Sequence, residues 1–151
     1  MKLKHVFSIA LIHALLLFSF SICSEPAKIE DKPFAEHQVV LQISDMAPAK
    51  QTLVLNVATN LIKHFGSDKI EIEIVAFGPG LRLLLADNAN KGRVSGLVDS
   101  GVRFAACDNT MSKFTSVLGH EPSLHKGAFR VNAGVVRILE LTAKDYQLIK
   151  P

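Results

Sequence analysis

The chain of 151 residues is 48% hydrophobic and 21% charged, a composition typical of one globular domain. This balance excludes a disordered protein, and nine glycines and six prolines are too few for a collagen-like chain. The formal charge is +3, but it falls to +1 without the first 24 residues, which hold two lysines and no acidic residue. So small a charge gives no global attraction to nucleic acid, and we expect no nucleic-acid partner.

Residues 1–24 have the three parts of a secretory signal peptide. Two lysines precede an apolar run over 6–20, and small residues follow around Cys23 and Ser24. The run is too short for an ordinary membrane span. We therefore predict cleavage after Cys23 or Ser24, a periplasmic or secreted mature protein, and membrane contact only through the signal segment. The alternatives are an uncleaved N-terminal anchor and a lipoprotein that begins at Cys23.

Residues 25–36 hold two prolines and six charged residues, which is typical of a flexible, solvated tether. The domain, residues 37–151, begins with an apolar run at 39–43 that fits a strand buried on both faces of a parallel sheet. A helix is predicted over 49–64, because apolar residues recur there at steps of three and four.

The second predicted strand, 70–77, alternates isoleucines with Glu71 and Glu73. Carboxylates at alternating positions usually form the solvent-exposed face of a strand, so we expect both to be exposed. The chain continues with short helices at 81–86 and 93–99, a strand at 102–106, a helix at 109–118, a polar loop at 119–127, a strand at 129–131, a helix at 133–144 and a strand at 146–149. This alternation predicts an α/β domain, with a mostly parallel sheet of about five strands and helices on both faces.

Cys107 falls where the third predicted strand ends and the next helix begins. A helix N-terminus carries partial positive charge and unpaired N–H groups, which favour a thiolate over a thiol. Asp108 acts in the opposite direction, because a neighbouring carboxylate repels a thiolate unless it turns away to cap the helix. A buried, inert cysteine fits the same pattern.

The Gly78-Pro79-Gly80 loop follows the second predicted strand and is expected at the same edge of the sheet, where parallel sheets bind ligands. It lacks a nucleotide-binding pattern, so a tight turn is its commoner role. His120 and His125 supply too few ligands for a usual zinc site, and we interpret them as part of a solvated loop. We predict no metal and no cofactor.

The run Phe-Ala-Ala-Cys-Asp-Asn-Thr-Met at 104–111 resembles the cysteine segment of the DsrE/DsrF-like family. The strand end at 75–80 and the tail over 133–141, closing with Tyr146 and residues 149–151, are similar to the same family. The resemblance covers about residues 37–151 and points to a subgroup of small, often exported proteins. It implies a compact α/β fold, assembly as trimers or hexamers, and sulfur held as a persulfide on Cys107.

Two features of this chain depart from the family. The best understood members, the DsrE and TusD proteins, are cytoplasmic sulfur relays that work with partner subunits, whereas this chain is predicted to be exported. Asp108 stands where many members of the subgroup have a small residue.

We expect a sulfur-relay or thiol protein in which Cys107 takes sulfur from a donor and passes it to an acceptor protein. The amides of Asn109 and Thr110 are the expected hydrogen-bond donors to the sulfur, and Gly78 to Gly80 the opposing wall. The alternatives are a non-catalytic module that binds a ligand or drives oligomerisation, in which Cys107 only packs, and a thiol redox sensor.

Overall fold

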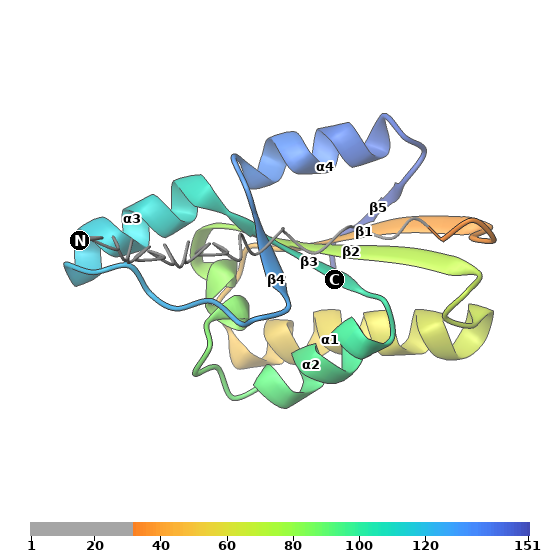
Figure 1. Ribbon diagram of the computed structural model, residues 1–151, viewed down its shortest axis with the longest axis horizontal. Helices are drawn as coiled ribbons and strands as arrows, with labels where there is room; N and C mark the ends of the chain where they lie inside the picture. The colour runs from red at the N-terminus through yellow and green to blue at the C-terminus, as the bar shows by residue number, and fades with distance from the viewer. Residues whose placement is uncertain (1–31) are drawn as a thin grey trace, which may run out of the picture.

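The computed structural model describes residues 32–151, which form a five-stranded sheet with helices on its two faces (Figure 1). The elements are β1 (His37–Ile43), α1 (Pro48–Phe65), β2 (Ile70–Ala76), the 3-10 helix η1 (Gly78–Leu84), α2 (Lys91–Asp99), β3 (Arg103–Cys107), α3 (Asp108–Leu118), β4 (Ala128–Val131), α4 (Gly134–Thr142) and β5 (Gln147–Ile149). The strand order is β4-β3-β2-β1-β5, and every pairing is parallel. The predicted α/β fold is confirmed.

The predicted signal peptide and the first part of the predicted tether lie outside the described residues. The described contacts begin at Lys32, five residues before β1. Its backbone N–H donates to Glu71 Oε1 at 2.9 Å, and its ammonium donates to the carbonyls of Ser67 and Ile70. These contacts hold the start of the described chain against β2. No helix of residues 32–151 is long and apolar enough to cross a membrane.

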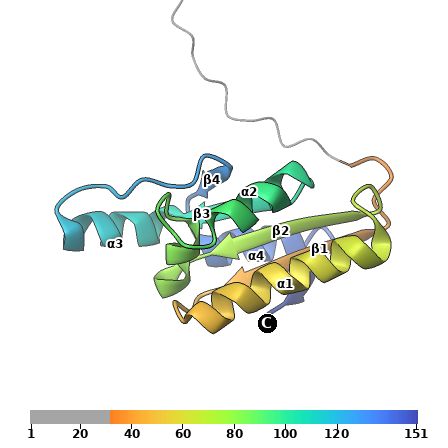
Figure 2. The same ribbon diagram turned by 90° about the horizontal axis from the view of Figure 1, so that it is seen from below.

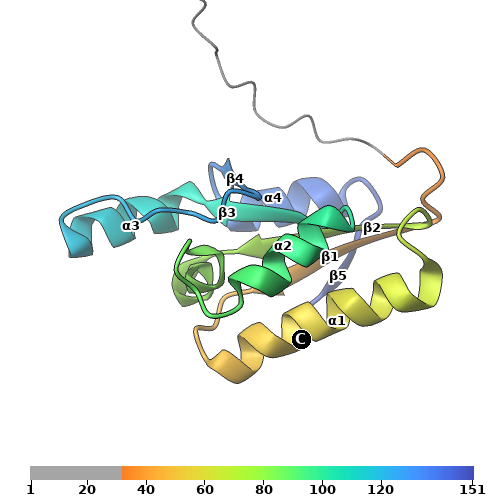
Figure 3. The same cartoon turned by 60° about the horizontal axis from the view of Figure 1, so that its bottom comes forward.

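The helices divide between the two faces of the sheet. α1 and α2 pack side by side on one face (Figures 2 and 3), and α4 covers the other. β4 and β5 are the opposite edge strands, so the chain between them crosses the whole sheet, and α4 lies on this crossing. α3 extends beyond the end of the sheet (Figure 1).

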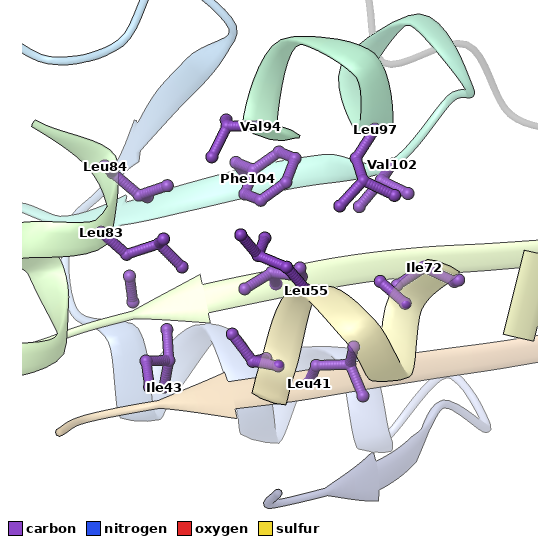
Figure 4. Close-up of a cluster of buried hydrophobic side chains, with 14 of the residues drawn as sticks. Leu41, Ile43, Leu55, Ile72, Leu83, Leu84, Val94, Leu97, Val102 and Phe104 are labelled. Atoms are coloured by element: carbon purple, nitrogen blue, oxygen red, sulfur yellow. The ribbon is translucent and has the colours of Figure 1, made fainter. Parts of the chain in front are cut away.

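The larger hydrophobic core lies between the sheet and the α1/α2 layer (Figure 4). Leu41, Ile72 and Phe104 from three neighbouring strands meet Leu55 of α1 and Leu97 of α2, and all are buried. Burial of one such side chain stabilises the fold by about 1.5–3 kcal/mol. A smaller core under α4 contains Val40, Val75, Ala105, Ile138, Leu141 and Tyr146.

The prediction that Glu71 and Glu73 are solvent-exposed was wrong. Glu71 is 8% exposed and Glu73 is fully buried. The alternation itself is real, since Ile70, Ile72 and Ile74 belong to the core on the α1/α2 face. The glutamates point to the other face, but α4 covers that face as it crosses the sheet.

Candidate functional site

Cys107 is both the last residue of β3 and the N-cap residue of α3. The strand passes into the helix with no loop between them, so the sulfur lies at the first turn of the helix. α3 begins one residue earlier than predicted, and neither Asp108 nor Asn109 is its N-cap. Only 5% of Cys107 is exposed. It is the one free cysteine within residues 32–151.

Polar hydrogens at the starts of two helices act on the thiol of Cys107 and favour its thiolate form. They belong to the N–H groups of Asn109 and Thr110 and the hydroxyl of Thr110 on α3, and to the N–H of Gly134 on α4. The starts of α3 and α4 lie near each other beside the end of β3 (Figure 1). A thiolate is stabilised at such a place because unpaired N–H groups and the partial positive charge of both helices face it.

Two opposing influences set the pKa of the Cys107 thiol. Burial raises the pKa of Cys107, because a buried anion loses its hydration. The hydrogen bonds from Gly134, Thr110 and Asn109 lower it by more, so the pKa lies below the ordinary value of a cysteine. The surroundings of this sulfur therefore differ from those of a cysteine packed among aliphatic side chains.

Gly78 is connected to the sulfur through Thr110. The Gly78 N–H donates to Thr110 Oγ1 at 2.8 Å, which leaves the hydroxyl hydrogen free to point at Cys107. Gly78 has φ of +52°, a left-handed conformation that favours glycine. Cys107, Asn109, Thr110 and Gly78 are therefore brought together by the structure.

Pro79 and Gly80 have different surroundings from Gly78. A Cβ on Gly80 would lie 2.4 Å from the carbonyl oxygen of Ile43, so this glycine lets η1 pack closely on the end of β1. Pro79 lines a pocket of roughly 380 Å³ beyond the ends of β1 and β5. Its other lining residues are Gln42, Ile43, Ser44, Asp45, Met46, Lys50, Lys150 and Pro151, and they do not include Cys107.

Asp108 faces a cation instead of the amides of its own helix. Its Oδ1 accepts a hydrogen bond from Arg130 Nε at 2.5 Å, and Arg130 also pairs with Glu121. Arg130 stands on β4, the edge strand beside β3. The repulsion expected between Asp108 and a thiolate at Cys107 is therefore offset by a neighbouring positive charge.

Gly134 is the donor that sequence reasoning missed. A Cβ at this position would lie 3.0 Å from Cβ of Phe77, so only glycine fits without displacing that ring. The Cys107–Val131 pairing between β3 and β4 brings the start of α4 to the cysteine. The available signal was a glycine just after a short strand, but the neighbour of that strand in the sheet was not visible in the sequence.

A charged cluster lies buried under α4. Arg137 of α4 and Arg103 of β3 both pair with Glu73, and Arg103 Nη1 lies 3.6 Å from Glu71. The Tyr146 hydroxyl donates to Glu71 and accepts from Arg103 at 2.6 Å. We name Glu71, Glu73, Arg103, Arg137 and Tyr146 the α4 charge cluster. Among the described residues no buried side-chain polar atom lacks a hydrogen-bond partner.

His125 is buried, in contrast to the solvated loop that was predicted for it. Its Nδ1 accepts the Gly127 N–H at 3.0 Å, and its Nε2 lies 2.9 Å from Ser95 Oγ. The neutral ring therefore carries its proton on Nε2 and donates it to the serine. Activation of Ser95 as a nucleophile needs the opposite tautomer, so this pair anchors the loop to α2. His120 is exposed, and no three His, Cys, Asp or Glu residues within 32–151 could hold a metal ion together.

Comparison with known proteins supports the fold. The chain is similar to the solved structure of a protein of unknown function, MTH1491 from Methanobacterium thermoautotrophicum, with 29% sequence identity and a TM-score of 0.69. The match covers 77% of this chain and 100% of that chain. No protein-family model matches the chain, and no curated protein matches it. The similarity therefore supports the α/β architecture and assigns no activity.

Proposed function

We propose that the protein carries sulfur as a persulfide on Cys107. The observation that supports this role is the set of hydrogen-bond donors from α3 and α4 around a single sulfur. A thiolate is the nucleophilic form of cysteine, and these donors favour it. The resemblance of residues 104–111 to the DsrE/DsrF-like family supports the same role.

The proposed transfer is redox-neutral. The Cys107 thiolate attacks the terminal sulfur of a donor persulfide or polysulfide, and the new S–S bond forms as the old one breaks. A persulfide donor leaves as a thiolate, and a polysulfide leaves as an anion shorter by one sulfur. An acceptor thiolate then attacks the outer sulfur of the Cys107 persulfide and releases Cys107 as a thiolate. Each step forms one S–S bond and breaks one, so no external oxidant is required.

The protein contributes electrostatic stabilisation of the thiolate that attacks and later leaves. The N–H groups of Asn109, Thr110 and Gly134 stabilise it at both stages. Because only 5% of Cys107 is exposed, we expect donors and acceptors that present a narrow terminal sulfur.

Intact-mass spectrometry tests this proposal directly. A Cys23→Ser protein exposed to polysulfide and then freed of excess reagent should gain about 32 Da for each added sulfur. The gain should disappear after reduction and should be absent in Cys23→Ser/Cys107→Ser. Absence of the gain, or an equal gain without Cys107, contradicts a persulfide carrier.

A non-catalytic module is the second candidate, and the near-complete burial of Cys107 is the observation that favours it. A packed cysteine reacts slowly with every thiol reagent until the protein unfolds. A carrier should instead react readily with small iodoacetamide in the folded state and slowly only with a bulky aromatic disulfide.

We also propose that the protein self-associates, as the family resemblance implies. The outer side of α4 supports this, because Val135, Val136 and Leu139 are between 51% and 62% exposed. Analytical ultracentrifugation should find an oligomer that Leu139→Glu dissociates, with Lys144→Glu as the matched control near the end of the same helix. A wild-type monomer at all concentrations contradicts self-association. Export to the periplasm or outside the cell stays a prediction.

A further inference from the structure

The first turn of α4 is tied to the centre of the sheet by a paired ionic contact. Arg137 donates from Nε to Glu73 Oε1 at 2.6 Å and from Nη2 to Oε2 at 2.7 Å. Glu73 is fully buried on β2. The Arg137 N–H also donates to the Ala133 carbonyl at 2.9 Å, which closes the turn that contains Gly134. The contact therefore fixes the helical turn that begins at Gly134, whose N–H lowers the pKa of Cys107.

The same turn is confined from a second side. Phe77 lies so close to Gly134 that an added Cβ would be 3.0 Å from the phenylalanine side chain. A bidentate guanidinium–carboxylate pair restricts both rotation and sliding, whereas a single contact restricts only distance. Together the two contacts fix the position of the Gly134 N–H.

Stability alone does not require an ionic pair at this position. Apolar side chains of similar volume are often as stabilising as a buried ion pair, or more so, because burial of charge costs hydration. Phe129 and Val131 of β4 already pack at this face. The Arg137–Glu73 pair is directional, whereas further apolar packing would not be. A directional contact is suited to fixing the orientation of α4.

We propose that Arg137, through its pair with Glu73, is a positioning residue that holds the α4 N-terminus with the Gly134 N–H directed at Cys107 Sγ. This inference deepens the proposed function, since it concerns the sulfur that would carry the persulfide. Arg137 acts through Gly134 and not on the sulfur itself.

The charged groups around this arrangement supply a matched control. Arg103 of β3 donates from Nε to Glu73 Oε2 at 3.0 Å, so it pairs with the same carboxylate, but it is not part of α4. Glu140 lies 3.7 Å from Arg137 on the exposed side of the helix. Arg103→Met and Arg137→Met therefore each remove one guanidinium from Glu73, and only the second releases α4.

The test compares the thiol pKa of Cys107 in these two variants. The pKa is measured from the pH dependence of the iodoacetamide reaction rate in folded Cys23→Ser protein, with folding checked by circular dichroism at each pH. We expect Arg137→Met to raise the pKa of Cys107 by about half a unit to one unit, as the Gly134 contact weakens. Arg103→Met should destabilise the fold and leave the pKa of Cys107 unchanged.

Equal shifts in the two variants, or no shift in either, overturn the proposal, because a general loosening of the fold would not distinguish them. If Arg137→Met does not fold, Arg137→Lys decides the question. Lysine keeps the positive charge but cannot form the bidentate contact with Glu73. Arg137→Lys should therefore still raise the pKa of Cys107, by less than Arg137→Met does. An unchanged pKa in that variant contradicts the proposal.

The intact-mass measurement of sulfur uptake is independent of this pKa comparison. A protein that takes up no sulfur but shows the Arg137-specific pKa shift would leave the positioning role intact and contradict only the carrier. A protein that takes up sulfur without that shift would contradict only the positioning role.

Discussion

The two faces of β2 differ in chemistry, although both are buried. Toward α1 and α2 the strand presents Ile70, Ile72 and Ile74, which pack among other apolar side chains. Toward α4 it presents Val75, which belongs to the smaller core, and Glu71 and Glu73, which pair with arginines and a tyrosine. Apolar contacts stabilise without fixing direction, whereas ionic hydrogen bonds are directional. The first face therefore contributes mainly to stability, and we propose that the ion pairs of the second help to set the orientation of α4.

The largest expected effect is on the apolar face. Phe104 is fully buried between the sheet and α2, so Phe104→Ala should lower the free energy of unfolding by about 3–5 kcal/mol through lost burial and the cavity left behind. Urea denaturation followed by circular dichroism measures the loss. The exposed Val117→Ala, on α3, should change stability by less than about 0.5 kcal/mol. Comparable losses in the two variants contradict the assignment of this core.

The second effect concerns Tyr146 on the charged face. Burial and the hydrogen bond to Glu71 raise the pKa of Tyr146 to about 12, against the opposing effect of Arg103. A raised folded pKa means that Tyr146 contributes stability below about pH 10, the ordinary tyrosine pKa, and that this contribution is lost as pH rises toward about 12. The chain has one tyrosine and no tryptophan, so phenolate absorbance reports this group alone.

Alkaline titration should therefore find a midpoint well above that of the same protein in denaturant. Tyr146→Phe should show no phenolate signal and a flatter dependence of stability on pH between about 10 and 12. A folded-state midpoint equal to the denatured one shows that the Tyr146 hydroxyl is not held by the α4 charge cluster.

The third effect isolates the amide of Gly134. Gly134 is the first residue of α4, where proline is tolerated, and Ala133 before it has the extended conformation that precedes proline. Gly134→Pro replaces the N–H that acts on the thiol with a ring methylene group, and Gly134→Ala is the control for the crowding that any added Cβ causes against Phe77. The proline variant should raise the pKa of Cys107 by about one unit relative to the alanine variant. Identical pKa values would show that this amide does not reach the thiolate.

The smallest effect concerns Asp108. Because Arg130 already pairs with this carboxylate, Asp108→Asn should lower the pKa of Cys107 by less than about half a unit. Arg130→Gln should raise it, since the carboxylate then faces the sulfur without a cation. The iodoacetamide rate profile measures both changes. A large drop in the pKa of Cys107 in Asp108→Asn would mean that Arg130 does not screen the thiolate from the Asp108 carboxylate.

Local sequence patterns were sufficient for the order of strands and helices and for one part of the site. The apolar run at 39–43 and the periodicity of 49–64 predicted β1 and α1, and the break after residue 106 placed Cys107 at a helix start. Asn109 and Thr110 followed from that placement, because their amides belong to the same helix.

The rest of the site depends on which strands are neighbours. β4 lies beside β3 and β5 lies beside β1, so α4 crosses the sheet, and neither adjacency has a local signature. For that reason the sequence did not reveal Gly134 as a donor to the sulfur. The same crossing buries Glu71 and Glu73, which a strand pattern alone describes as a solvent-exposed face.

The most direct test is the pKa of Cys107 itself in otherwise unmodified Cys23→Ser protein. The iodoacetamide rate should rise with pH at a midpoint below about 8.5, the free-cysteine value, and the midpoint should return to that value in denaturant. The free energy of unfolding relative to Cys107→Ser should then grow with pH between the folded and the unfolded pKa. A folded-state midpoint at or above that of the denatured protein contradicts the account, because the N-termini of α3 and α4 would then not stabilise a thiolate.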